Sequence, residues 1–181
     1  MRSLLAAVLI TLVAGACGAT ESKLIPLQDL PDDVAALVDQ TWGDFERGFA
    51  GRIECMAPVS LLLVADVPDG DAVYRRDPAR IEIEIPTSPA RFSESLVHEL
   101  AHHLEATCPE HAQLRVSFLA AQGMLAASGW FDGDEWADVP SEHFAEAVVH
   151  VVNGDRILHD DVIRLTPEAI EAVRHWGRRQ P

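Results

Sequence analysis

The chain has 181 residues and a formal net charge of −15, with 14 basic against 29 acidic residues. A surface this acidic repels nucleic acid and anionic lipid headgroups, so the composition argues against a nucleic-acid-binding protein. The length suits one domain with a hydrophobic core of its own.

The N-terminus has the order of a secretory signal peptide. A short basic start at Arg2 precedes an apolar run over residues 4–13, which is too short for a stable membrane span. The small residues before Cys17 resemble a bacterial lipobox, in which the cysteine is lipidated and becomes the mature N-terminus. We predict a lipoprotein-type signal over residues 1–16 and an extracytoplasmic protein anchored to the bacterial cell membrane through Cys17. Ordinary signal cleavage near Ala16 is the alternative.

After this signal, we expect residues 17–28 to form a tether and residues 29–181 to form a single domain. The domain opens with a helical pattern. Apolar residues recur at helical spacing from Pro31 to Phe49, and Gly51 ends the pattern.

Three strands are predicted next. Residues 59–65 form a continuous apolar run, and residues 72–75 follow a Pro-Asp-Gly turn signal. Residues 80–85 alternate isoleucine with glutamate, which predicts a strand with one exposed face. We expect this strand to be the edge of a small three-stranded sheet.

The following helix contains the most informative motif of the chain. Ser88 and Pro89 are typical of a helix start, and Cys108-Pro109 ends the pattern. Inside it, residues 98–102 read His-Glu-Leu-Ala-His, an HExxH motif. His98 and His102 lie four residues apart on one helix face, where both can reach a single Zn²⁺. Glu99 between them can act as the general base on a water molecule.

Three more helices are predicted, over residues 111–127 with Gly129 as the stop, over residues 140–152, and over residues 166–178 with Thr166 as the cap. Strands followed by helices indicate an α+β fold class, with a C-terminal helical part.

Apart from Cys17, the chain has two cysteines, Cys55 and Cys108. An even pair in an oxidising compartment favours a disulfide, which stabilises a fold by constraining the unfolded chain. The alternative is Cys108 as a metal ligand after His102, which would leave Cys55 unpaired.

Two histidines make an incomplete catalytic zinc site, because such sites use three protein ligands. Glu142 is the favoured third ligand, since it begins a mostly apolar helix. Glu146, one turn further on, can fix the tautomer of a ligand histidine. Glu105 and His111 are alternatives in a looser geometry, and His103 is expected to be exposed. The longer motif HExxHxxGxxH is excluded, because Glu105 and Cys108 stand where it requires Gly and His.

HExxH followed by Glu-x-x-Ala-Glu resembles the gluzincin metallopeptidases. The similarity is greatest to the group typified by the catalytic domain of anthrax lethal factor, with thermolysin more distant, and it covers roughly residues 80–152. It implies a zincin-like fold in which His98, His102 and Glu142 bind one Zn²⁺. It also implies that Glu99 is the base and Glu146 supports a ligand. A peptide substrate would add as an extra strand along residues 80–85.

The chain departs from this group in one respect. The lethal-factor group has a tyrosine shortly before its glutamate helix that stabilises the developing oxyanion, and residues 133–139 contain none. The only tyrosine is Tyr74. His143 and His150 are the other candidates for this role.

The sequence therefore predicts an exported zinc metallopeptidase that acts on a peptide or protein substrate. Three alternatives stay open. They are a zinc-binding lipoprotein without turnover, a zinc amidase acting on cell-wall peptides, and a structural lipoprotein without metal.

Overall fold

The computed structural model of the protein describes residues 23–68, 70–154 and 163–179. The described elements follow one another in this order: β1 (Leu24–Pro26), α1 (Asp32–Gly48), the short 3₁₀ helix η1 (Ile53–Cys55), β2 (Val59–Val64), β3 (Ala72–Arg76), β4 (Ala79–Glu84), α2 (Pro89–Thr107), α3 (His111–Gln122), the 3₁₀ helix η2 (Trp136–Asp138), α4 (Pro140–Asn153) and α5 (Pro167–Arg178). The predicted α+β class is confirmed.

The sheet has four strands in the order β1-β2-β4-β3, so the prediction of three strands was wrong. The additional strand, β1, lies inside the predicted tether and pairs in parallel with β2. Only Leu24 of its three residues is buried, so the segment has no alternating pattern that sequence reasoning could detect. Its partner β2 begins 35 positions later along the chain, at Val59.

The predicted edge strand is also corrected. β4 lies between β2, with which it pairs in parallel, and β3, with which it pairs antiparallel. The edge on this side of the sheet is therefore β3. The alternation of β4 correctly predicted its buried face, because Ile81 and Ile83 are buried. Alternation reports which face is buried, whereas an edge depends on which strand pairs alongside.

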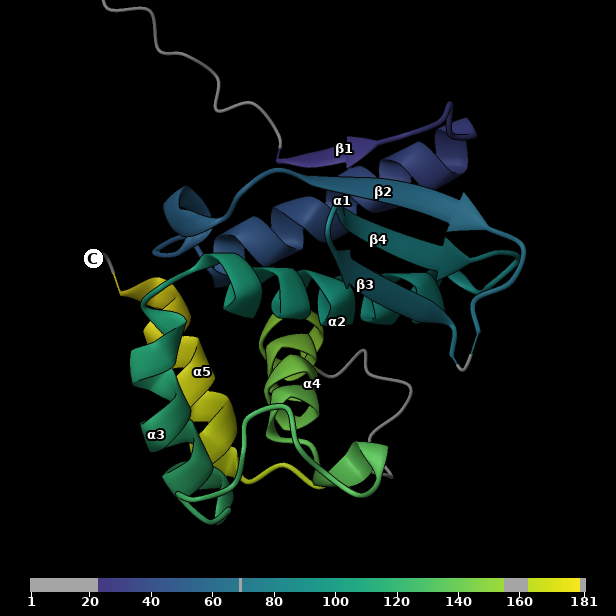
Figure 1. Ribbon diagram of the computed structural model, residues 1–181. Coiled ribbons are helices and arrows are strands. Elements are labelled where there is room, and N and C mark those ends of the chain that lie inside the picture. The colour runs from purple at the N-terminus through teal and green to yellow at the C-terminus, as the bar shows by residue number, and fades with distance from the viewer. Residues whose placement is uncertain (1–22, 69, 155–162, 180–181) are drawn as a thin grey trace, which may run out of the picture.

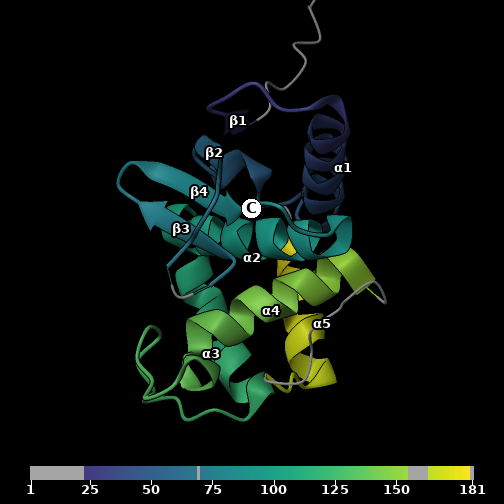
Figure 2. The same ribbon diagram turned by 90° about the vertical axis from the view of Figure 1, so that its right-hand side faces the viewer.

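Helix α2 lies between the two halves of the molecule (Figure 1). The sheet is on one side of it, and α3, α4 and α5 are on the other. Figure 2 shows α4 crossing beneath α2, with α1 beside the sheet. The core is continuous across both halves, since Leu61 and Ile81 of the sheet and Phe144 of α4 belong to one buried cluster.

Local signals account for most helix ends. Ser88 caps α2 by accepting a hydrogen bond from the Arg91 backbone N–H at 3.2 Å, and Thr166 caps α5 in the same way. The predicted helix over residues 111–127 is shorter than expected. It ends at Gly123, whose φ of 74° is the left-handed conformation of a helix C-cap.

The predicted signal peptide, Ala16, Cys17 and the first part of the tether lie outside the described residues. Among the residues that the structure describes, no helix has both the length and the apolar character needed to cross a membrane.

Candidate metal centre

The two histidines of the HExxH motif project from one side of α2. Their side chains are mostly buried, with 14% of His98 and 15% of His102 exposed. Their Nε2 atoms lie 3.1 Å apart. The four-residue spacing has therefore brought two imidazole nitrogens to one point, as the sequence predicts.

Helix α4 supplies a carboxylate at the same point. Glu142 is in the first turn of α4, which begins at Pro140, and its Oε2 lies 3.0 Å from His98 Nε2 and 3.4 Å from His102 Nε2. Ligand atoms about 2.0–2.1 Å from a tetrahedral Zn²⁺ lie about 3.3 Å from one another. The separations between these three atoms fit that requirement.

The outer nitrogens of both histidines also contact carboxylates. His98 Nδ1 lies 2.8 Å from Glu146 Oε1, and His102 Nδ1 lies 3.1 Å from Glu105 Oε1. A carboxylate on Nδ1 keeps the proton on that nitrogen, which leaves the Nε2 lone pair available to a metal. Glu146 thus has the place that the sequence predicts for it. Glu105 faces the outer side of His102 and not the point where the Nε2 atoms meet.

The carboxylates make this point favourable for positive charge. Burial acts to lower the pKa of His98, but its hydrogen bonds with Glu142 and Glu146 outweigh burial and raise the pKa to about 10. Burial acts in the same direction on His102, and hydrogen bonds with Glu105 and Glu142 raise its pKa to about 9. For Glu142, burial acts to raise the pKa, and the two histidines hold it well below its usual range. A divalent cation would receive the same electrostatic support.

Glu99 lies next to these ligand atoms, on the same helix. Its side chain is buried, and burial raises its pKa, although His98 and His102 act to lower it. A backbone hydrogen bond from Tyr74 of β3 also acts to lower this pKa. A carboxylate with a raised pKa accepts a proton more readily than an exposed one, which suits a general base.

The three ligands and Glu99 lie in a cleft of about 510 Å³. Ala72, Val73 and Tyr74 of the edge strand β3 form one wall, and Phe131 and Trp136 contribute to the lining. A second hollow of about 390 Å³ shares Ala72, His98, Glu99 and Trp136 with the first. Trp136 therefore lines both hollows, next to His98 and Glu99.

Sequence reasoning missed Trp136. Its ring stacks on His98 with the centroids 6.3 Å apart, and its Nε1 donates a hydrogen bond to Glu142 Oε2 at 2.9 Å. It stands six residues before Glu142, in the stretch over residues 133–139 where the lethal-factor group has its tyrosine. Because Trp136 is close to Glu142 in the chain, its place near the site could have been inferred from the sequence. Its contact with His98 could not.

The histidines proposed as oxyanion stabilisers lie elsewhere. His143 Nε2 donates to the Ala137 carbonyl at 2.7 Å, and its Nδ1 accepts from Gln122 at 3.0 Å. His150 is two turns beyond Glu142 on α4 and is not part of the cleft lining. Tyr74 does line the cleft, and its hydroxyl lies 3.1 Å from His103 Nδ1.

Two other histidines differ from expectation. His103 was expected to be exposed, but it is fully buried, because its ring packs against Tyr74 of β3 with the ring centroids 5.3 Å apart. Its Nε2 donates to the Ala57 carbonyl at 2.7 Å. His111 was an alternative ligand. It packs instead among Trp130, Phe144 and Trp176 in the core, away from the two Nε2 atoms.

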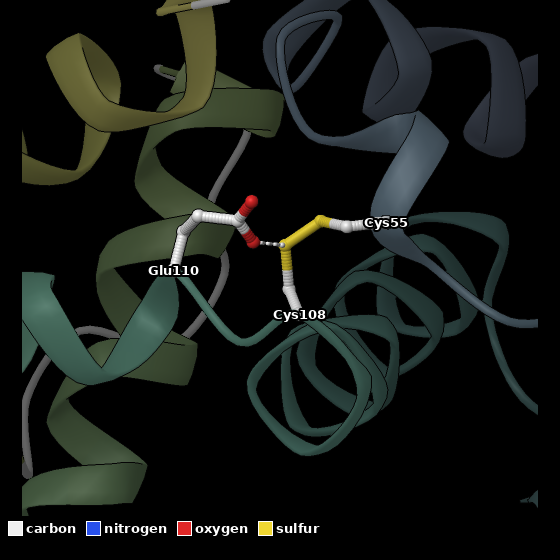
Figure 3. Close-up of side chains that lie close together, drawn as sticks. All are labelled: Cys55, Cys108 and Glu110. Atoms are coloured by element: carbon white, nitrogen blue, oxygen red, sulfur yellow. Dashed lines mark hydrogen bonds between the residues drawn. A yellow bond between two sulfur atoms is a disulfide. The ribbon is translucent and has the colours of Figure 1, made fainter. Parts of the chain in front are cut away.

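The two cysteines form the predicted disulfide. Cys55 and Cys108 are bonded with their Cα atoms 5.0 Å apart, which excludes Cys108 as a ligand beside His102. Figure 3 shows Glu110 next to this bridge, with Oε2 lying 3.5 Å from Cys108 Sγ. Sulfur atoms in a disulfide are not thiolate ligands, so this trio is not a metal site while the bridge is intact.

No protein-family model, curated protein or solved structure matches the chain. The site must therefore be judged on its own geometry.

Proposed function

We propose that the protein is a zinc metallopeptidase with a gluzincin-type centre in a zincin-like fold. The main support is one observation: His98 Nε2, His102 Nε2 and Glu142 Oε2 lie within 4.8 Å of one another. Glu99 lines the same cleft. A site that served only to bind a metal would not need this fourth, buried carboxylate beside the ligands.

The residues divide the chemistry between them. Zinc bound to His98, His102 and Glu142 would polarise the scissile carbonyl and lower the pKa of water. Glu99 accepts a proton from the attacking water and passes it to the leaving amine. Its burial favours both steps, because a carboxyl group with a raised pKa can hold a proton between them.

The outer edge of β3, which pairs with no strand among the described residues, supports a peptide as the substrate. This strand ends the sheet and its residues line the cleft, so an extended chain can pair with its backbone while passing Glu99. The earlier assignment of this role to residues 80–85 is replaced, because β4 is paired on both sides.

Trp136 is the donor that we assign to the oxyanion. Its Nε1 already points to Glu142 Oε2, the atom that both histidines approach. A carbonyl oxygen beside the ligands would lie within reach of this N–H as negative charge develops. Tyr74 is the second candidate. Both donors already have a partner, but the partner of Trp136 is a ligand atom of the site, whereas the Tyr74 hydroxyl is directed at the buried His103.

The signal sequence adds the location. An exported protein attached to the bacterial membrane through Cys17 would act on peptides outside the cytoplasm. Cell-wall peptides are an alternative substrate for the same centre, and a zinc-binding lipoprotein without turnover is the alternative without catalysis.

The test separates metal binding from chemistry. We expect Glu99→Gln to bind one equivalent of zinc and to lose peptide cleavage, because the amide cannot accept the proton. His98→Ala and Glu142→Ala should lose zinc. Glu171→Gln, on the exposed surface of α5, is the control and should keep both properties. Metal content is measured on the purified protein, and cleavage on a peptide library with and without chelator.

The outcomes distinguish the alternatives. Undiminished cleavage by Glu99→Gln would disprove the mechanism, and full zinc content in Glu142→Ala would disprove the third ligand. Zinc binding by the wild type without cleavage of any peptide favours the binding lipoprotein. Chelator-sensitive release from purified cell wall, without cleavage of linear peptides, favours the amidase.

A further inference from the structure

Glu105 is a buried carboxylate that the proposed chemistry does not use. It lies one helical turn after His102, and only 3% of its side chain is exposed. Three hydrogen-bond donors surround it. Oε1 lies 2.9 Å from Ser141 Oγ and 3.1 Å from His102 Nδ1, and Oε2 accepts from Trp130 Nε1 at 2.7 Å. Burying a carboxylate is costly unless donors compensate it, and here three separate segments provide them.

We propose that Glu105, Trp130 and Ser141 position His102 for metal, so that metal affinity depends on a tryptophan of the aromatic core. Glu105 is a positioning residue here, since it acts through His102. The inference rests on the proposed zinc centre and adds to it the means by which one ligand is fixed.

Trp130 is held firmly enough for this role. Its ring packs against His111 and Phe118 with centroid distances of 5.1 and 5.9 Å. The Arg115 guanidinium lies 5.0 Å from its ring centroid. Its carbonyl accepts a hydrogen bond from the Ser141 backbone N–H at 3.0 Å. These contacts fix the direction of the indole N–H. The Glu105 carboxylate therefore keeps its hydrogen bond with Trp130 only while it stays in this orientation.

The alignment matters to His102 because a ring that binds metal through Nε2 must keep its proton on Nδ1. Glu105 Oε1 accepts at that nitrogen. Without the carboxylate, Nδ1 keeps one hydrogen-bond partner among the described residues, Ser141 Oγ at 3.3 Å. A hydroxyl can donate as well as accept, so it does not select the tautomer.

The arrangement mirrors the one at His98 but differs in its dependence on the core. Glu146 lies on α4 and is 18% exposed, and its contact with His98 joins two helices directly. Glu105 is on the same helix as His102. The orientation of its carboxylate is fixed by two partners outside that helix, Trp130 and Ser141. The second ligand is thus coupled to the packing of the segment that includes Trp130.

The chain offers a matched control for this coupling. Trp176 belongs to the same aromatic cluster, where it contacts His111 and Phe144. Its Nε1 is buried and has no hydrogen-bond partner among the described residues. Trp130→Phe and Trp176→Phe therefore remove the same atoms from the same cluster, but only the first removes a hydrogen bond to Glu105.

The experiment measures zinc affinity by chelator competition and the absorption spectrum of the Co²⁺-loaded protein. We expect Glu105→Gln to bind zinc about 10- to 100-fold more weakly, the range typical of outer-sphere substitutions, with a changed Co²⁺ spectrum. Trp130→Phe and Ser141→Ala should each show a smaller loss, about 3- to 10-fold. Trp176→Phe should bind as tightly as the wild type. Thermal unfolding of the metal-free variants identifies any that fail to fold, and the Ser141 variant then replaces the Trp130 variant.

Each result has one meaning. If the wild type binds no zinc, the proposed function is wrong and this inference falls with it. If the wild type binds zinc and Glu105→Gln binds it equally well with an unchanged Co²⁺ spectrum, only the inference is overturned. Equal losses in Trp130→Phe and Trp176→Phe would also overturn it, because they would indicate a general effect of packing.

Discussion

His102 and His103 are neighbours in the sequence, yet they lie in two different regions of the molecule. His102 faces the cleft, where Glu105 and Glu142 raise its pKa to about 9 in spite of burial. His103 faces the packed side of α2, where burial lowers its pKa and its partners are the Ala57 carbonyl and the Tyr74 hydroxyl. Both rings are largely buried, so the difference comes from their partners. Carboxylates stabilise the imidazolium of His102 strongly enough to outweigh burial, whereas at His103 the Ala57 carbonyl acts to raise the pKa but does not outweigh burial.

The largest effects are expected when this pair is substituted one residue at a time. His102→Ala should weaken zinc binding by more than about 100-fold, since it removes a ligand and not an outer-sphere group. The fold should change little. His103→Ala should instead lower the free energy of unfolding by about 3 kcal/mol, because it leaves a cavity in the packed side of α2 and removes the hydrogen-bond partner of the Ala57 carbonyl and the Tyr74 hydroxyl.

Zinc affinity and urea unfolding of the metal-free protein are measured on both variants. The comparison fails if His103→Ala loses zinc as strongly as His102→Ala while remaining folded. In that case the two faces of α2 would not be independent.

The disulfide also belongs to the packed region, and its removal should have an effect as large as that of His103→Ala. It joins the C-terminal end of α2 to η1 across a sequence separation of 53 residues. Replacing both cysteines by serine should lower the free energy of unfolding by about 4 kcal/mol in the chain-entropy model. Zinc affinity of the folded fraction should be unchanged. A specific loss of zinc in this variant would place Cys108 in the site after all.

The region around the cleft was the easier one to predict from the sequence. The HExxH spacing determines that His98 and His102 share a helix face, and Ser88-Pro89 determines where that helix starts. Glu142 and Glu146 were found because they begin a second apolar helix one turn apart. These are local patterns. Helix geometry converts the first into the positions of His98 and His102, whereas the meeting of Glu142 and Glu146 with His98 also requires α4 to pack against α2.

The packed region was harder to predict, because it depends on long-range pairing. The burial of His103 requires Tyr74, which lies on a strand 29 positions earlier in the chain. The edge position of β3 and the existence of β1 follow from strand order, which no local pattern encodes. Trp130 and Trp136 were missed for a similar reason, since their roles follow from the docking of a loop onto α2 and α4.

His111 tests the packed region through pH. It is fully buried, and burial lowers its pKa from 6.5 to about 4. The fold therefore stabilises the neutral ring. This contribution is complete above pH 6.5 and is lost as the pH falls toward 4, because the unfolded chain binds the proton first. The difference corresponds to about 3 kcal/mol.

We expect His111→Phe to lose less stability than the wild type between pH 7 and pH 4, by about that amount. Urea unfolding of the metal-free protein at the two pH values measures it. His175→Gln, on the exposed side of α5, is the control and should keep the wild-type dependence. An unchanged pH dependence in His111→Phe would mean that folding does not shift the pKa of His111.

The smallest effect is expected at Trp136, which lines the cleft. Comparing it with Tyr74, which contacts the buried His103, again contrasts the cleft with the packed region. The side chain is 47% exposed, so its N–H is partly solvated and worth less than a buried donor. Trp136→Phe should keep the ring over His98 and lower kcat about 10-fold. Because it also removes a donor to Glu142 Oε2, zinc affinity should fall about 3-fold. Tyr74→Phe removes a hydroxyl bound to His103 and should lower stability without lowering kcat. The reverse result, with kcat reduced by Tyr74→Phe and unaffected by Trp136→Phe, would transfer the oxyanion role to Tyr74. It would also mean that the buried histidine next to it is linked to the chemistry in the cleft.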